Sequence, residues 1–206
     1  FDYGEFNALT IPNNRADKNQ LDTEDIGIIK TRNDSFVHWD KKQHTVELSI
    51  TNKHGNCKKK TISSQHALHI VFSSGWFELY VANMLSSWEY AKEIIMNANF
   101  PYKNNNPKNE IDIIVNTGNR LLFVECKTQI NDITDIDKFR TAVKNYGGMG
   151  CKALFITEAP MKATTAEKCK DSDIITFSLQ DCGNLLPTQD TLFLKLKQEL
   201  FEINKQ

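Results

Sequence analysis

The amino-acid sequence predicts an α/β fold in which helices flank a central mixed β-sheet, with a small β-containing region before it. Two patterns lead to this prediction. Apolar residues recur at helical spacing in several segments, and short runs with strand-like alternation lie between those segments. A chain of 206 residues is long enough for one large domain with a smaller appendage. We place the division between residues 1–70 and residues 71–206.

The composition is that of an ordinary globular protein, 40% hydrophobic and 25% charged. No apolar run approaches the roughly 20 residues that a membrane span needs, so we expect no membrane insertion. Lys and Arg number 25 against 26 Asp and Glu, which gives no overall basic footprint for indiscriminate nucleic-acid binding. Five cysteines without close pairs indicate reduced thiols in a cytoplasmic protein.

The N-terminal region is predicted to contain an arm followed by a small β-rich segment. Its first 25 residues are rich in Asn, Asp and Lys, which favours a linker or a loosely packed arm. Strand-like alternation over residues 26–30, 36–39 and 45–50 indicates a small antiparallel piece. Residues 52–60, with three consecutive lysines, favour a turn and a solvated basic loop rather than a DNA contact. His66 and His69 lie in an apolar-flanked segment and are expected to be packed.

The remaining chain alternates between helical and strand-like patterns. Phe77, Val81, Leu85 and Trp88 recur at helical spacing and predict a helix that begins near residues 73–74, with aromatic side chains in the core. Strand patterns follow, separated by an asparagine-rich loop at 102–109, and then helices alternate with strands, an order typical of an α/β sandwich with a mixed sheet. The predicted strands are 94–100, 110–115, 121–127, 153–157 and 174–179, and the later predicted helices are 132–146, 160–170 and 192–203.

Two adjacent strand patterns bring acidic side chains and a lysine to one face of a hairpin. Alternation places Glu125 and Lys127 on one face of their strand, with the apolar residues and Cys126 on the other. A type II′ turn centred on Gly118 and Asn119 would make the numbers of paired residues add to 237, which sets Asp112 opposite Glu125. A turn shifted by one residue would still keep Asp112 on this face.

Opposed carboxylates of this kind favour a bound cation. They repel each other when both are ionised, unless a positive ion lies between them. Mg²⁺ or Mn²⁺ prefers carboxylate, carbonyl and water oxygens, so the carbonyl of Cys126 is a further candidate ligand. Such an ion promotes attack of water on a phosphate. Lys127 would orient or deprotonate that water, or neutralise charge on the phosphate.

The string Asp112, then Glu125-Cys126-Lys127, resembles the signature of the PD-(D/E)xK nucleases. Glu78 matches the helix position that many members use as an additional metal ligand. Gln129 falls where some members place a polar side chain beside the site. The resemblance implies a restriction-endonuclease-like sandwich that hydrolyses phosphodiester bonds with Mg²⁺ or Mn²⁺.

Four further strings sharpen the resemblance: G-W-F-E, N-E-I-D-I-I, L-F-V-E-C-K-T and D-K-F-R before Gly147-Gly148. Together they are similar to the nuclease half of the CRISPR-associated CARF-domain nucleases, over about residues 75–157. In that family a CARF domain binds cyclic oligoadenylate and switches on cleavage of single-stranded nucleic acid by a homodimer. The resemblance therefore implies an endonuclease acting on single-stranded DNA or RNA, in type III CRISPR antiviral defence.

The N-terminal residues depart from that family. Residues 1–70 contain no β-α-β sensor unit, and the chain begins at Phe1 rather than at a methionine. We therefore expect residues 1–70 to be a linking region, and cyclic oligoadenylate to act only where a longer parent protein contains a CARF domain.

Several residues also have simpler interpretations. Glu78 flanks an apolar helix stripe, so its role could be limited to solvating the helix start. Glu110 shares a face with Asp112 and is interpreted as a surface charge at a strand end. Lys138 and Arg140 are candidate contacts to backbone phosphate, although a solvated face explains them equally well. Two other functions stay open: a restriction or repair nuclease of the same fold, and a non-catalytic nucleic-acid-binding module.

Overall fold

The computed structural model describes residues 9, 15–73, 75–100, 109–130, 132–180 and 188–201. The chain divides into two compact units, residues 1–76 and 77–206, called here the N-terminal and the C-terminal unit. Helix α4 (Gly75–Ser86) contains the division. Within the described residues, no helix combines the length and hydropathy required to cross a bilayer.

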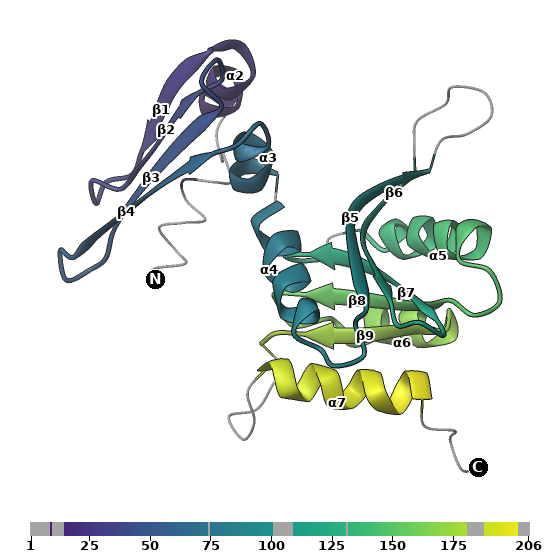
Figure 1. Ribbon diagram of the computed structural model, residues 1–206. Helices are drawn as coiled ribbons and strands as arrows, with labels where there is room; N and C mark the ends of the chain where they lie inside the picture. The colour runs from purple at the N-terminus through teal and green to yellow at the C-terminus, as the bar shows by residue number, and fades with distance from the viewer. Residues whose placement is uncertain are drawn as a thin grey trace. The chain divides into compact units, whose positions relative to one another are not determined.

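The N-terminal unit is built on a four-stranded antiparallel sheet with the order β1-β2-β3-β4 (Figure 1). One face of the sheet is buried: Val37, Trp39 and Val46 are fully inaccessible to solvent. Helix α3 adds Ala67 and Val71 to the same apolar cluster. The elements of this unit are α2 (Arg15–Thr23), β1 (Ile26–Lys30), β2 (Phe36–Asp40), β3 (Thr45–Thr51), β4 (Cys57–Ser63) and α3 (Ala67–Phe72).

The predicted antiparallel piece is confirmed, but three other predictions for this unit are wrong. Part of the expected loose arm is helix α2, because Leu21 packs against the apolar cluster and the Glu24 carbonyl accepts a hydrogen bond from the Trp39 indole at 3.2 Å. The expected basic loop contains strand β4, which pairs with β3 along its length. Its side chains are mostly exposed, so it shows no apolar alternation. His66 and His69 are exposed rather than packed.

The C-terminal unit contains a five-stranded mixed sheet with the order β5-β6-β7-β8-β9. The β5–β6 and β6–β7 pairs are antiparallel, whereas the β7–β8 and β8–β9 pairs are parallel. The asparagine-rich loop predicted at 102–109 lies outside the described residues, except for Asn109, which begins β6. The elements are β5 (Glu93–Phe100), β6 (Asn109–Asn116), β7 (Leu121–Lys127), α5 (Thr134–Tyr146), β8 (Lys152–Thr157), α6 (Ala163–Asp171), β9 (Ile174–Ser178) and α7 (Thr188–Phe201).

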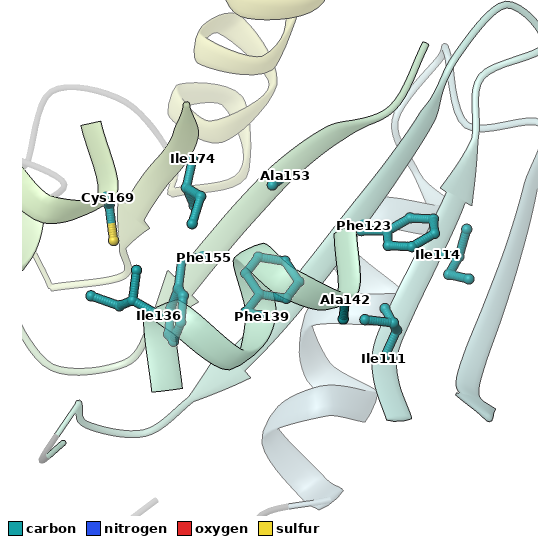
Figure 2. Packing of buried hydrophobic residues seen from close by; sticks show 10 residues of the cluster. All are labelled: Ile111, Ile114, Phe123, Ile136, Phe139, Ala142, Ala153, Phe155, Cys169 and Ile174. Carbon is teal, nitrogen blue, oxygen red and sulfur yellow. The ribbon is translucent and has the colours of Figure 1, made fainter. Parts of the chain in front are cut away.

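Both faces of this sheet are buried. On one face, α5 and α6 pack against strand side chains such as Phe123 and Phe155, and Figure 2 shows this cluster from close by. Side chains of the opposite parity, such as Val124 and Leu154, are also fully buried. Helices α4 and α7 cover that second face, and Trp88, just after α4, stacks on Phe193 of α7 with ring centroids 6.1 Å apart. The predicted α/β sandwich is confirmed.

The β6–β7 hairpin has the register that its turn predicts. Ile113 pairs with Val124 and Asn116 with Leu121, so paired numbers add to 237. Gly118 has a φ of +89°, whereas Asn119 is not among the described residues with positive φ. A positive φ at the first central residue alone is the mark of a type II′ turn. Continued by one residue, this register sets Asp112 level with Glu125.

Candidate active site

Asp112 lies at the point where β6 separates from β7. The paired residues of the ladder end at Ile113 and Val124. One residue further, the Asp112 carboxylate accepts a hydrogen bond from the backbone N–H of Cys126 at 2.7 Å. A side-chain acceptor thus satisfies a β7 amide where the backbone ladder has stopped. This contact holds the Asp112 carboxylate against the backbone between Glu125 and Lys127.

The neighbouring strand is also irregular beside Asp112. On β5, Met96 pairs with Ile113 and Ala98 with Ile111, so Asn97 faces Asp112, and its φ is +52°. Ile111 and Ile114 belong to the same apolar cluster although an odd number of positions separates them. Strict strand alternation would place Ile111 on the opposite face from Ile114, so the alternation of β6 is interrupted at this point. The regular alternation of side chains is therefore lost in the part of β6 that contains Asp112.

Glu125 and Lys127 share one face of β7, as alternation predicts. The Lys127 ammonium lies 2.8 Å from a Glu125 carboxylate oxygen, with 36% of the Lys127 side chain and 14% of the Glu125 side chain exposed. Cys126, between them, is buried. The lysine therefore has a partly open approach to solvent, while the carboxylate lies deeper.

The carboxylates of this region destabilise one another in their ionised forms. Burial raises the pKa of Glu125 to about 7, and the charge of Asp112 adds to the shift against the opposing effect of Lys127. Burial likewise raises the pKa of Glu78 to about 7, with Asp112 the next largest cause. Burial is the largest single influence on Lys127 and acts to lower its pKa. The charge of Glu125, its hydrogen bond to Lys127 and the charges of two nearby aspartates together outweigh burial and raise that pKa above its usual value. Glu78 on α4 is thus electrostatically coupled to the hairpin residues.

The other candidate residues lie on exposed surface. Gln129, Lys138 and Arg140 are all exposed, and Lys138 lies 3.7 Å from Asp135 in the first turn of α5. Asp135 was not predicted as part of the site, yet its charge acts on the pKa of both Glu125 and Lys127. Its position in the first turn of the helix that follows β7 is a sequence signal for this role. That helix, α5, packs on the same sheet face as Glu125.

The donor set fits a hard divalent cation. Asp112, Glu125 and Glu78 provide carboxylate oxygens, the ligands such ions prefer, and Lys127 is the one ammonium close to them in the described residues. Burial is the main cause of the raised Glu125 and Glu78 pKa values, and repulsion from Asp112 adds to it. A cation would relieve that repulsion. Among the described side chains, no three acidic, histidine or cysteine groups converge closely enough to hold an ion unaided. Backbone carbonyl or water oxygens would have to complete the coordination, and Glu125 would exchange its lysine partner for the ion.

Known structures share the fold of this chain. Can2 from Sulfobacillus thermosulfidooxidans, solved in complex with cyclic tetra-adenylate, is 24% identical, with a TM-score of 0.51 over 66% of this chain and 39% of its own. Protein VC1899 from Vibrio cholerae is 14% identical, with a TM-score of 0.56 over 73% of this chain and 40% of its own. The chain thus spans about two fifths of the length of these two proteins. No curated protein sequence matches it significantly.

The sequence also matches a family model. The model describes a Card1-like endonuclease domain and aligns with residues 66–185, more than half of the chain. The matched segment runs from the start of α3 through all strands of the mixed sheet, and so contains Glu78, Asp112, Glu125 and Lys127. The resemblance to the PD-(D/E)xK nucleases that the sequence motifs indicated is confirmed. The chain belongs to the family of Card1-like endonuclease domains.

Proposed function

We propose that this chain is a divalent-metal-dependent endonuclease that hydrolyses phosphodiester bonds in single-stranded DNA, with single-stranded RNA as a second substrate. The observation that supports the proposal most is the arrangement at the end of the β6–β7 ladder. The Asp112 carboxylate accepts a hydrogen bond from the Cys126 amide at 2.7 Å. Glu125 forms an ion pair with Lys127 on β7. Two carboxylates and an ammonium are thereby presented together at one end of the hairpin.

Each of these residues has a distinct role in the proposal. Asp112 and Glu125 hold Mg²⁺ or Mn²⁺ together with the Cys126 carbonyl, and Glu78 adds a carboxylate from α4. The ion supplies the positive charge that favours attack of water on the phosphate and stabilises the charge that develops there. Lys127, released from Glu125, orients or deprotonates the water, or neutralises the phosphate. Gln129, Lys138 and Arg140 contact the nucleic-acid backbone.

We further propose that the chain is the effector part of a type III CRISPR ancillary nuclease that acts as a homodimer in the cytoplasm. The similar protein Can2 was solved with cyclic tetra-adenylate, which supports control by a cyclic oligoadenylate in a longer parent protein. The ligand would then bind a CARF domain, and the residues described here would carry out the cleavage.

Cleavage of circular single-stranded DNA in the presence of Mn²⁺ tests the proposal. The protein should linearise and then degrade the circle, and the Glu125→Ala and Lys127→Ala variants should be slower by roughly two orders of magnitude or more. Glu110→Ala is the matched control, because Glu110 is acidic, lies on the same strand as Asp112 and is exposed. This variant should keep the activity.

Two results would count against the proposal. Intact DNA in every lane, also for a longer parent protein with cyclic oligoadenylate, would favour a non-catalytic binding module of the same fold. Cleavage that survives Glu125→Ala would mean that another site, or a contaminating nuclease, performs the reaction.

A further inference from the structure

The outer face of the N-terminal sheet combines an aromatic ring with flanking lysines. Its strand register places four residues in one row across the sheet, because Lys30 pairs with Phe36, Phe36 with Ser49, and Ser49 with Lys59. The Lys59 ammonium extends over the ring of Phe36, 5.5 Å from its centroid. Lys30 and Lys59 are exposed and Phe36 is half-buried. The apolar core and helix α3 lie on the opposite face, so this row points away from the core.

Charge is distributed unevenly over this sheet. Residues 26–63 contain eight lysines and arginines against three acidic residues, a net charge of +5, although the whole chain carries −1. Edge strand β4 contributes Lys58, Lys59 and Lys60, all exposed. Of the three acidic residues, Glu47 and Asp40 lie one and two rows away from Phe36 on the same face, and only Asp34, in the turn before β2, lies at the same end as Phe36. The end of the sheet that contains the Phe36 row is therefore its basic end.

The lysines of the Phe36 row differ from those at the other end of the sheet. Lys42, in the turn between β2 and β3, forms an ion pair with Asp25 at 3.0 Å, and Lys41 donates a hydrogen bond to the Asp22 carbonyl. Within the described residues, no carboxylate lies at ion-pair distance from Lys30 or Lys59. Lys30 and Lys59 stand on either side of Phe36 in the row, and no described carboxylate neutralises their charge, which suits an anionic ligand.

We propose that the Lys30–Phe36–Lys59 row binds single-stranded nucleic acid. Phosphates would contact the two lysines, and an unpaired base would stack on Phe36, a combination that suits single strands because every base offers a flat apolar surface and the backbone offers negative charge. A duplex keeps its bases stacked inside and could use only the lysines. The proposal deepens the proposed function by giving the N-terminal unit a role in holding substrate, but it requires no cleavage.

Fluorescence anisotropy with a labelled oligothymidylate, measured in EDTA so that no metal-dependent cleavage occurs, tests this proposal. Phe36→Leu keeps an apolar side chain but removes the stacking surface, and should weaken binding at least fivefold without changing its salt dependence. Lys30→Gln combined with Lys59→Gln should weaken binding and make the slope of log affinity against log salt shallower by about 1.4, because each phosphate contact to a single strand contributes about 0.7.

Lys42→Gln is the matched control, since it removes an exposed lysine from the turn at the other end of the same sheet, and it should bind like the unaltered chain. Thermal melts of all variants establish that the fold is kept. The proposal is overturned if Phe36→Leu binds as tightly as the unaltered chain, if Lys42→Gln loses as much affinity as the double variant, or if a duplex or polyglutamate binds as tightly as the single strand. Binding is measured without cleavage, so the two proposals fail independently. Loss of this binding surface would not contradict the proposed nuclease activity, and an inactive nuclease would not contradict this binding surface.

Discussion

The Asp112 carboxylate accepts its hydrogen bond from the Cys126 backbone amide at 2.7 Å. Asp112 lies one residue beyond the last paired residue of β6, and Cys126 lies two beyond that of β7. The contact replaces a backbone acceptor with an acidic side chain at the place where two strands part. An aspartate held in this way is fixed beside Glu125 without help from any ligand. The position of Asp112 therefore does not depend on an ion, and the role of its hydrogen bond can be measured in the metal-free protein.

The Asp112 hydrogen bond can be separated from the Asp112 charge by two substitutions. Asp112→Asn keeps a carbonyl oxygen that can accept from Cys126, whereas Asp112→Ala leaves that amide without the acceptor. Both remove the same negative charge. Without metal, we expect Asp112→Ala to be less stable than Asp112→Asn by about 1–3 kcal/mol, the usual effect of leaving a buried donor unsatisfied. Urea denaturation in EDTA measures the difference, and equal stabilities would show that the hydrogen bond has no structural role.

The raised pKa of Glu125 predicts how the stability of the metal-free protein depends on pH. The pKa is about 7 in the folded chain against an ordinary value of 4.5, so between these pH values the folded state binds more protons than the unfolded state. The free energy of unfolding should therefore fall as pH rises from about 4.5 to about 7. Glu125→Gln should flatten this decline, because Gln does not ionise. Thermal melts in EDTA across this range measure it, and identical slopes for the two proteins would contradict the expected titration.

Lys127 is predicted to matter for cleavage but not for metal binding. Its ammonium is paired with Glu125 at 2.8 Å, so the two compete for the carboxylate that the ion would use. Lys127→Ala should bind Mn²⁺ at least as tightly as the unaltered protein while cleaving roughly two orders of magnitude more slowly or worse. Isothermal titration of Mn²⁺ and a cleavage assay on the same preparation measure both effects. A variant that loses Mn²⁺ binding would assign Lys127 to the structure of the site instead.

Gly118 is predicted to stabilise the hairpin through its backbone alone. Its φ is +89°, and a Cβ added there would meet no atom closer than the Lys92 Cγ, at 4.0 Å. Steric crowding is therefore absent, and any loss of stability comes from the left-handed conformation. Gly118→Ala should lower the free energy of unfolding by about 1 kcal/mol, and Gly118→Asn by less, because Asn tolerates positive φ better. If denaturation shows no loss for Gly118→Ala, the turn has changed its conformation.

Much of the C-terminal unit could be predicted because its signals are local. The tight turn at Gly118 sets the hairpin register, and period-two alternation sets the facing of Glu125 and Lys127. Strand β4 escaped prediction because an exposed edge strand has no apolar face to reveal it. Helix α2 was not predicted because its packing depends on contact between Leu21 and core residues that lie far from it in the sequence.

The Asp112–Cys126 hydrogen bond could not be predicted for a related reason. The sequence indicates that Asp112 and Glu125 share a face, but not where the ladder between their strands stops. The neighbouring strand β5 is also irregular there, with a positive φ at Asn97, and no sequence pattern indicates that irregularity. Likewise, the influence of Asp135 on Glu125 arises from the packing of α5 on the sheet, which a pattern along one strand does not encode.

Binding of Mn²⁺, followed by isothermal titration, tests the central claim that Asp112 and Glu125 share one divalent ion. The unaltered chain and the exposed-site control Glu110→Gln should bind with the same affinity. Asp112→Asn and Glu125→Gln, each of which removes one charge from the site while keeping its shape, should both weaken binding by roughly a hundredfold. Undiminished Mn²⁺ binding by either of these two variants would contradict the account, because the ion would then be held elsewhere.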